Sequence, residues 1–129
     1  MDVPEDVIMK DVWTVGLEIH KELGPGLLES VYQQILAAEL KALGHKVECE
    51  VDCKLNWKRR EFRKAFRADV IIDGIVILEI KATDSMPPVF ARQLRTYLKV
   101  IGLRLGAVVN FGLATFKQGF SRQAMGMPK

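Results

Sequence analysis

The chain is poor in the residues that build covalent or zinc-based sites. Its 129 residues include two cysteines and two histidines. Cys49 and Cys53 lie in a segment predicted to be extended, which would hold them roughly 13 Å apart, too far for a disulfide. Without a second cysteine or histidine pair at matching spacing, they also make a poor zinc site. We therefore expect both cysteines to be reduced and structural.

Other absences narrow the class of protein. The apolar runs are too short to span a membrane, and residues 1–5 do not form a signal peptide, so we expect a cytoplasmic protein. The sequence has no repeats, no low-complexity segments and no glycine-rich phosphate loop. A net charge of +3 is mildly basic and says little about partners by itself. The length fits one domain over residues 1–129, with a flexible tail after about residue 121.

Hydrophobic spacing predicts the order of elements. We expect helices over residues 5–23, 27–43 and 89–101, and strands over residues 47–57, on both sides of a turn at residues 73–74, over residues 103–111 and around residues 116–120. A strand–helix–strand crossover implies parallel pairing of residues 75–80 with residues 105–111. The predicted fold is an α/β mixed sheet flanked by helices. His20, near the end of the first helix, is expected to cap or pack.

Residues 67–83 carry charge where buried strands rarely do. Asp69 lies near the start of one strand, and Glu79 and Lys81 near the end of the next. The apolar run of residues 75–78 indicates a strand buried on both faces. An unpaired buried charge is costly, so these three residues require a structural or functional reason.

The turn between the two strands decides how the charges are placed. Glu79 and Lys81 share a face because side chains alternate along a strand. A two-residue turn would send Asp69 and Glu79 to opposite faces, whereas a loop with an odd number of residues would bring them together. We predict the odd loop, or a bulge. The converging carboxylates would suit Mg²⁺ or Mn²⁺. The alternative is an internal salt bridge in which Lys81 neutralises Asp69 or Glu79.

A basic hairpin is predicted to precede these carboxylates. From Lys54 to Arg67, seven basic residues stand against one acid, Glu61. The hairpin is either a solvated edge whose charges resist aggregation or a phosphate-binding surface. The residues predicted to bind nucleic acid there are Lys58, Arg59, Arg60, Arg63, Lys64 and Arg67.

Two helices carry further candidate pairs. Glu29 and Tyr32 share a face, as do Gln93 and Tyr97. Glu29 either complements the helix dipole or supplies a metal ligand. Gln93 and Tyr97 either orient a phosphate, a base or the lysine, or are a surface glutamine and a packed tyrosine.

Residues 26–32, GLLESVY, resemble the signature of the GxxExxY family, which belongs to the PD-(D/E)xK nuclease superfamily. Further segments resemble the family pattern in the same order: residues 23–29, 67–69, 79–82, 93–98 and 110–112. The resemblance covers about residues 7–112. One departure is Phe90, which stands where the family often has a histidine.

The resemblance implies a restriction-endonuclease-like core of order α-β-β-β-α-β, here with an extra N-terminal helix. Asp69 and Glu79 would hold Mg²⁺ or Mn²⁺, with the Ile80 carbonyl and Glu29 as further ligands. Lys81 would position or help deprotonate the attacking water. Gln93 and Tyr97 would match a Q-x-x-x-Y element that contacts nucleic acid or braces the lysine.

The expected function is a Mg²⁺-dependent nuclease acting on DNA or RNA. The alternatives are a nucleic-acid-binding module of the same fold without useful turnover, and a protein-interaction domain. The complete set of Asp69, Glu79 and Lys81 argues against both. Because no separate recognition element is visible, we expect either a homodimer or a targeting protein partner.

Overall fold

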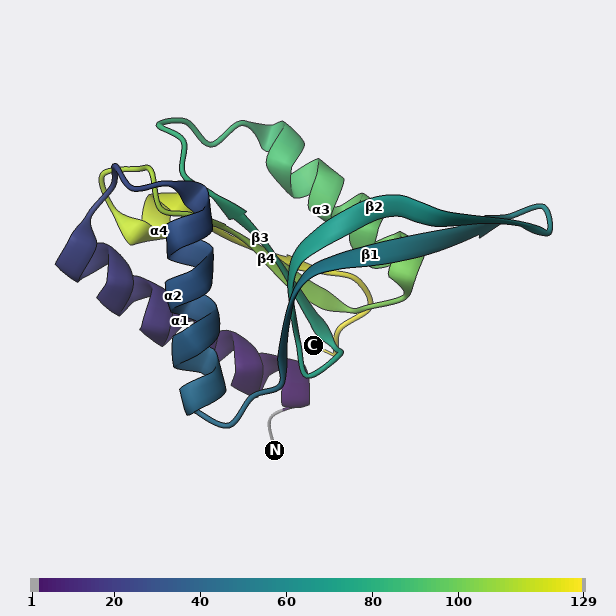
Figure 1. The fold of residues 1–129 in the computed structure, drawn as a ribbon, viewed down its shortest axis with the longest axis horizontal. Helices are drawn as coiled ribbons and strands as arrows, with labels where there is room; N and C mark the ends of the chain where they lie inside the picture. Colours follow the sequence, from purple (N-terminus) through teal and green to yellow (C-terminus); the bar gives the residue numbers. More distant parts are fainter. Residues whose placement is uncertain (1–2, 129) are drawn as a thin grey trace.

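The computed structural model describes residues 3–128, and its helices and strands follow the predicted order as far as residue 110 (Figure 1). They are α1 (Pro4–Leu23), α2 (Glu29–Ala42), β1 (Val47–Trp57), β2 (Arg60–Ile72), β3 (Val76–Lys81), α3 (Pro88–Ile101), β4 (Leu105–Asn110), α4 (Phe116–Gly119) and β5 (Phe120–Ala124). Within these residues, no helix is long and apolar enough to cross a membrane.

The strands form one mixed sheet in the order β1-β2-β3-β4-β5. Only the β3–β4 pairing is parallel, and the crossover through α3 produces it, as predicted. Figure 1 shows α1 and α2 on one side of the sheet and α3 on the other. This is the α/β, restriction-endonuclease-like arrangement that the sequence predicted.

Two apolar clusters hold the helices to the sheet. Residues of α1 and α2, including Leu36, pack with Val70 and Leu78 on one face. Leu94 and Leu98 of α3 pack with strand residues on the other face. Because β3 is buried on both faces, the charges at its end sit between two helical layers.

The β1–β2 hairpin extends beyond the sheet as a two-stranded ribbon, whose distal part, residues 54–64, we call the arm (Figure 1). Trp57 pairs with Arg60, so the arm closes in a two-residue turn at Lys58 and Arg59. Both turn residues have positive φ, 48° and 65°. Paired positive φ values match the right-handed twist of hairpin strands, which explains the tight turn.

The C-terminal segment differs from the prediction. We expected a strand around residues 116–120, but this position was wrong because Thr115 and Gln118 form a capping box that starts the short helix α4. The strand β5 follows and pairs antiparallel with β4. Residues 121–124, which we assigned to a flexible tail, belong to this strand.

His45 lies between α2 and β1 and links this segment to α1 and to the β2–β3 turn. Its Nε2 lies 2.7 Å from Asp11 Oδ2 on α1, and its Nδ1 lies 2.7 Å from Asp73 Oδ2 in the β2–β3 turn. The backbone of Lys46 also donates to Asp73 Oδ1 (2.8 Å). Burial lowers the pKa of His45, but the two carboxylates outweigh burial, so the pKa is raised. We call Asp11, His45 and Asp73 the histidine clasp.

The histidine clasp should make stability depend on pH. A group whose pKa is higher in the folded than in the unfolded state stabilises fully below the unfolded pKa and loses this contribution as the pH rises through the folded pKa. His45→Gln should therefore lower the free energy of unfolding by about 1–2 kcal/mol near pH 5.5 and by less near pH 9. Urea denaturation across this range measures the difference, and a pH-independent difference would contradict the clasp.

Candidate active site

The turn between β2 and β3 brings the two predicted carboxylates to one face. Ile72 pairs with Val76, so residues 73–75 form a three-residue loop, with positive φ at Asp73 (52°) and Gly74 (70°). This confirms the odd loop. Because Val70 pairs with Leu78, the next position in the same register sets Asp69 opposite Glu79.

The strands β2 and β3 separate at these carboxylates. Their backbone pairing covers only Val70–Ile72 and Val76–Leu78, and beyond it the Ile80 N–H donates to Asp69 Oδ2 (2.8 Å). The Asp69 carboxylate thus accepts the hydrogen bond that a backbone carbonyl of β2 would accept if the pairing of the two strands continued. Since the N–H and carbonyl of one strand residue point toward the same neighbouring strand, the Ile80 carbonyl also faces this gap.

The hairpin bends at the same level. Glu50, in the position across from Asp69, has a positive φ of 54°. Val70 packs in the α1–α2 cluster, whereas Ala68, two residues earlier, packs in the α3 cluster. In a regular strand, residues two apart point to the same face. Because Ala68 and Val70 instead pack against opposite helical layers, the strand is bent here, and the bend carries β1 and β2 away from β3.

Glu79 is a buried carboxyl with an unused oxygen. It is 6% exposed, and its Oε1 has no hydrogen-bond partner within residues 3–128. Burial, followed by the negative charge of Asp69, raises its pKa from 4.5 to about 9, while the charge of Lys81 opposes the shift. Glu79 therefore holds a proton at neutral pH.

Lys81 lies near the carboxylates without pairing with them. Its Nζ lies 4.8 Å from the centre of the Phe90 ring, a cation–π contact. Among the described residues it makes no ion pair with Asp69 or Glu79, so the internal salt bridge is not formed. Phe90, the departure from the family pattern, thus contacts the ammonium group.

The donor set fits a hard divalent cation. It offers two carboxylates, one unpaired buried oxygen on Glu79 and the nearby Ile80 carbonyl. Mg²⁺ is commonly held by one or two carboxylates, with waters and substrate phosphates completing its shell. Residues 3–128 contain no group of three His, Cys, Asp or Glu side chains that could hold a metal by themselves. Such a cation would therefore need oxygens from water or substrate.

Tyr32 fixes the start of α2 and with it Glu29. The Tyr32 hydroxyl donates to the Gly24 carbonyl (2.5 Å) and accepts from the Leu27 N–H (3.2 Å), and its ring stacks on Phe111. The structure thus gives the tyrosine of this motif a bracing role. Gly26, with φ of 121°, supplies a backbone shape that other residues rarely adopt.

Glu29 is exposed, yet its pKa responds to the charges of the candidate site. Burial raises its pKa, followed by the negative charge of Asp69, while Lys81 lowers it and Glu50 raises it further. Glu29 thus faces the same group of charges as Glu79. Its role as a metal ligand remains a prediction.

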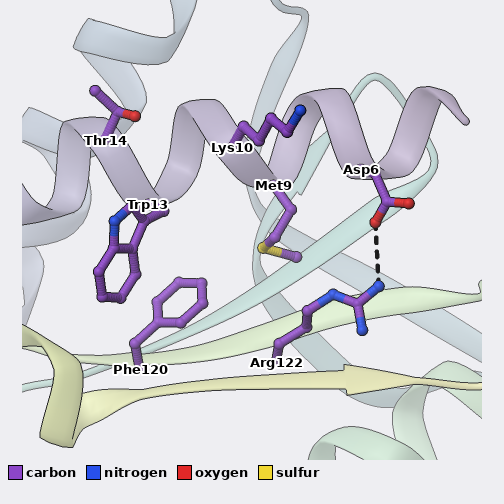
Figure 2. A pocket seen from close by; sticks show the side chains of 7 residues that line it. All are labelled: Asp6, Met9, Lys10, Trp13, Thr14, Phe120 and Arg122. Atoms are coloured by element: carbon purple, nitrogen blue, oxygen red, sulfur yellow. Dashed lines mark hydrogen bonds and ion pairs between the residues drawn. The ribbon is translucent and has the colours of Figure 1, made fainter. Parts of the chain in front are cut away.

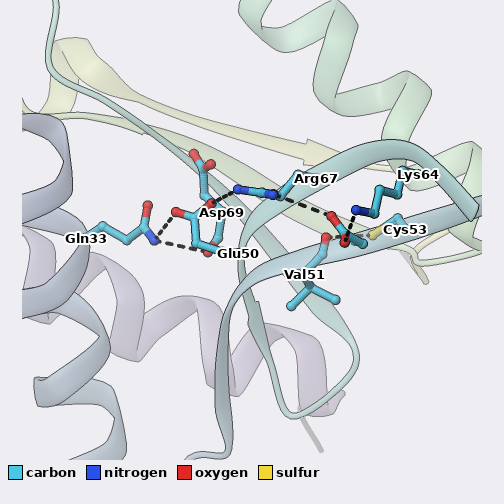
Figure 3. Close-up of polar contacts among 8 residues, drawn as sticks. Gln33, Glu50, Val51, Cys53, Lys64, Arg67 and Asp69 are labelled. Carbon is cyan, nitrogen blue, oxygen red and sulfur yellow. Dashed lines mark hydrogen bonds and ion pairs between the residues drawn. The ribbon is translucent and has the colours of Figure 1, made fainter.

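Gln33 and Glu50 were missed by sequence reasoning. Figure 3 shows Gln33 on α2 reaching across to β1 and β2. Its Nε2 donates to Glu50 Oε1 (2.8 Å) and to the Asp69 carbonyl (3.4 Å). These bonds hold the bent hairpin against α2 next to Asp69. Gln33 lies four residues after Glu29, a spacing that places both on one helix face and was readable from the sequence.

Tyr97 lies beside the carboxylates, whereas Gln93 does not engage them. The Tyr97 ring stacks on Phe66 with centroids 3.8 Å apart. Burial raises the Tyr97 pKa, and the charges of Glu79 and Asp69 add to the shift. Gln93 is exposed and forms no hydrogen bond within the described part of the chain. Its predicted contact with nucleic acid remains a prediction.

Asn110 organises the loop that follows Lys81. Its Oδ1 accepts from the N–H groups of Thr83 (3.1 Å) and Gly112 (3.0 Å), and its Nδ2 donates to the Ser85 carbonyl (2.9 Å). A Cβ added to Gly112 would lie 2.2 Å from the Thr83 carbonyl oxygen. This close fit explains the Asn-Phe-Gly segment and anchors the path from β3 to α3.

The basic residues of the hairpin divide into two groups. Several are paired with acids: Arg67 with Asp52 (3.4 Å) and Glu50 (3.8 Å), Lys64 with Asp52 (3.9 Å), Arg63 with Glu61 (3.4 Å), and Lys54 with Glu61 (3.9 Å). Figure 3 shows the contacts of Lys64 and Arg67. Within residues 3–128, Lys58, Arg59 and Arg60 have no acidic partner. Uncompensated positive charge is therefore concentrated at the arm tip.

A hollow of about 510 Å³ lies elsewhere, between α1 and β5 (Figure 2). Trp13 and Phe120 form its apolar part, and Asp6 pairs with Arg122 (3.1 Å) at its side. None of the predicted site residues lines it. His20, also on α1, bonds the Leu113 carbonyl (2.8 Å) and packs near Phe116, as its predicted packing role requires.

Comparison with known proteins identifies the superfamily of the chain. Residues 6–123 match the family model described as the PD-(D/E)XK nuclease superfamily. No curated protein and no solved structure matches the chain. Members of the superfamily are generally nucleases and typically use divalent metals. Because this match covers nearly the whole chain, the protein belongs to the PD-(D/E)XK nuclease superfamily.

Proposed function

We propose that this protein is a Mg²⁺- or Mn²⁺-dependent phosphodiesterase acting on DNA or RNA. The observation that carries the proposal is the unpaired, buried oxygen of Glu79 beside Asp69. Burying the Glu79 carboxyl beside the partly buried carboxylate of Asp69, with no cation between them, lowers the stability of a fold. A functional reason is therefore favoured, since perturbed carboxyl groups cluster at catalytic sites.

The chemistry follows from the charge of the substrate. A phosphodiester repels an attacking hydroxide, and a bound divalent cation would screen that charge and lower the pKa of water. Asp69 and Glu79 would hold the cation, with the Ile80 carbonyl and Glu29 as further oxygen donors. Lys81 would orient the attacking water and stabilise charge that develops on the phosphate. Tyr97 would brace the site through its contact with Phe66.

Finer assignments belong to the same proposal. The bracing of Gly24 and Leu27 by Tyr32 supports membership of the GxxExxY family. The basic hairpin supports nucleic acid as substrate, with Lys58, Arg59, Arg60, Arg63, Lys64, Arg67 and Gln93 as contacts. We also propose a single cytoplasmic domain, targeted either by homodimerisation or by a protein partner.

Cation binding should be linked to proton release. Without the cation, the raised pKa of about 9 keeps Glu79 protonated at neutral pH. A carboxylate must lose its proton before it can act as a ligand. Affinity for Mg²⁺ should therefore increase as the pH rises toward 9.

Glu79→Gln should stabilise the cation-free protein at alkaline pH. Because the folded-state pKa is raised from 4.5 to about 9, wild-type stability falls as the pH rises through this interval. The neutral glutamine avoids that loss, so we expect a gain of about 1–3 kcal/mol in the free energy of unfolding near pH 8.

Chemical denaturation near pH 8 and near pH 4 measures this effect. At about pH 4 the two proteins should agree within about 0.5 kcal/mol. Glu48→Gln, at an exposed position on β1, is the matched control and should change stability little at either pH. Equal stability of Glu79→Gln and wild type near pH 8 would contradict the raised pKa.

The function is tested by calorimetry with Mn²⁺ and Mg²⁺ and by cleavage of labelled DNA and RNA. Wild type should bind the cation and release about one proton near pH 7, seen as a dependence of the measured heat on buffer. The double variant Asp69→Ala with Glu79→Ala should lose both binding and cleavage. Lys81→Met should keep cation binding but lower the cleavage rate by about 100-fold or more.

The variants separate the competing functions. Cation binding without cleavage of any substrate would favour a nucleic-acid-binding domain of the nuclease fold. Failure of the wild type to bind either cation at millimolar concentration would rule out the proposed site. Cleavage that survives in the double variant would place the chemistry elsewhere.

A further inference from the structure

One face of the arm exposes large apolar side chains that the proposed catalytic site does not use. Trp57 is 60% and Phe62 48% exposed, although apolar side chains of this size are usually buried. Cross-strand partners share a face, and Leu55 pairs with Phe62. Trp57 lies two residues after Leu55, so it belongs to the same face. We call Leu55, Trp57 and Phe62 the arm face.

The arm face continues a surface that begins at the carboxylates. Cys53 lies two residues before Leu55 and pairs with Phe66, and the pairing register shifts between Cys53 and Leu55. Cys53 and Phe66 both pack in the α3 cluster. Phe66 stacks on Tyr97, whose pKa responds to the charges of Glu79 and Asp69. Aromatic groups thus extend from the site, through the Phe66–Tyr97 stack, to Phe62 and Trp57. A hollow of about 460 Å³ between Leu55 and the end of α3 borders this surface.

Positive charge is concentrated where the arm face ends. Lys58, Arg59 and Arg60 have no acidic partner within residues 3–128, and Lys58 Nζ lies 5.6 Å from the centre of the Trp57 ring. Glu50 and Asp52 lie toward the base of the hairpin, where they pair with Arg67, and Glu61 within the arm pairs with Lys54 and Arg63. The arm therefore offers flat aromatic rings next to cations that have no acidic partner among the described residues.

Charge and shape together select the occupant. A second copy placed on this face by a two-fold axis would bring the same cationic tips near each other, which like-charge repulsion opposes. Phosphates match the cations, and the flat faces of bases match the rings. Paired bases hide these faces within the duplex stack, whereas unpaired bases expose them.

We propose that the arm face binds single-stranded nucleic acid by stacking unpaired bases on Trp57 and Phe62, while Lys58, Arg59 and Arg60 bind its phosphates. The strand would then run along the Phe66–Tyr97 stack toward Asp69 and Glu79. This direction rests on the proposed nuclease function, but binding to the arm does not. The preferred substrates would be single strands and the unpaired ends of duplexes.

The test is equilibrium binding in EDTA, where no cation-dependent cleavage occurs. The probes are fluorescein-labelled oligothymidylate, an oligouridylate of the same length and a DNA duplex of the same length. In the double variant Trp57→Ala with Phe62→Ala, affinity for the single strands should fall by about tenfold or more. Affinity for the duplex should fall by less than about twofold, and the salt dependence of binding should be unchanged.

Two further variants separate stacking from charge and from folding. Trp57→Phe keeps an aromatic face and should retain most of the single-strand affinity. The triple variant Lys58→Gln, Arg59→Gln, Arg60→Gln should weaken all three probes and reduce the slope of log affinity against log salt by about two. Leu43→Ala removes an equally exposed apolar side chain far from the arm and should change nothing.

The outcomes decide the proposal independently of catalysis. Unchanged single-strand affinity after loss of both rings would overturn it, as would an equal loss for single strands and duplex, or no binding by wild type. A loss on both single-stranded probes supports general base stacking, and a loss on one alone identifies DNA or RNA as the ligand. If binding depends on the rings but no cation-dependent cleavage occurs, the arm proposal stands and the nuclease proposal fails.

Discussion

The juxtaposition of Asp69 and Glu79 is the constraint to which the local structure responds. A sheet that continued its regular ladder would leave no space between β2 and β3 at this level. Here the strands separate, Asp69 takes the Ile80 N–H in place of a backbone acceptor, and Glu50 adopts a positive φ that bends the hairpin. Beyond the bend, β1 and β2 continue as the two-stranded ribbon that ends in the arm (Figure 1). Site and arm are thus two results of one interruption in the sheet.

Contacts on both sides of the site keep this interruption local. The histidine clasp fixes the β2–β3 turn, and the length of that turn determines which face Asp69 and Glu79 share. Asn110 fixes the chain just after Lys81. Because the pKa of Glu79 is higher in the folded state, the fold loses stability as the pH becomes alkaline. The surrounding elements must compensate for this loss. Rigid bonds beside a destabilised carboxyl are what a preorganised site requires.

The sequence predicted most helices and strands, the mixed sheet and the odd-numbered loop. Each of these depends on the local spacing of apolar residues or on the alternation of side chains along a strand. The apolar run of β3 indicated burial, and the charges at its end indicated the site. Sequence reasoning missed Gln33 and Glu50, because their contact joins α2 to a bend whose backbone shape the residues of β1 do not encode. It misplaced the strand near Phe116, although the Thr115–Gln118 capping box was readable. Lys81 stacking on Phe90 depended on tertiary packing and was not predictable.

The uneven distribution of charge connects the two proposals. Glu29, Glu50 and Asp69 carry negative charge around the site, and Glu79 adds to it once it loses its proton, so an approaching phosphate is repelled there until a cation neutralises these groups. Lys58, Arg59 and Arg60 attract the same phosphate at the arm tip whether or not a cation is present. Capture at the tip would therefore precede entry into the site, and only entry would need the cation. In this arrangement the cation controls access to the carboxylates as well as the reaction that follows.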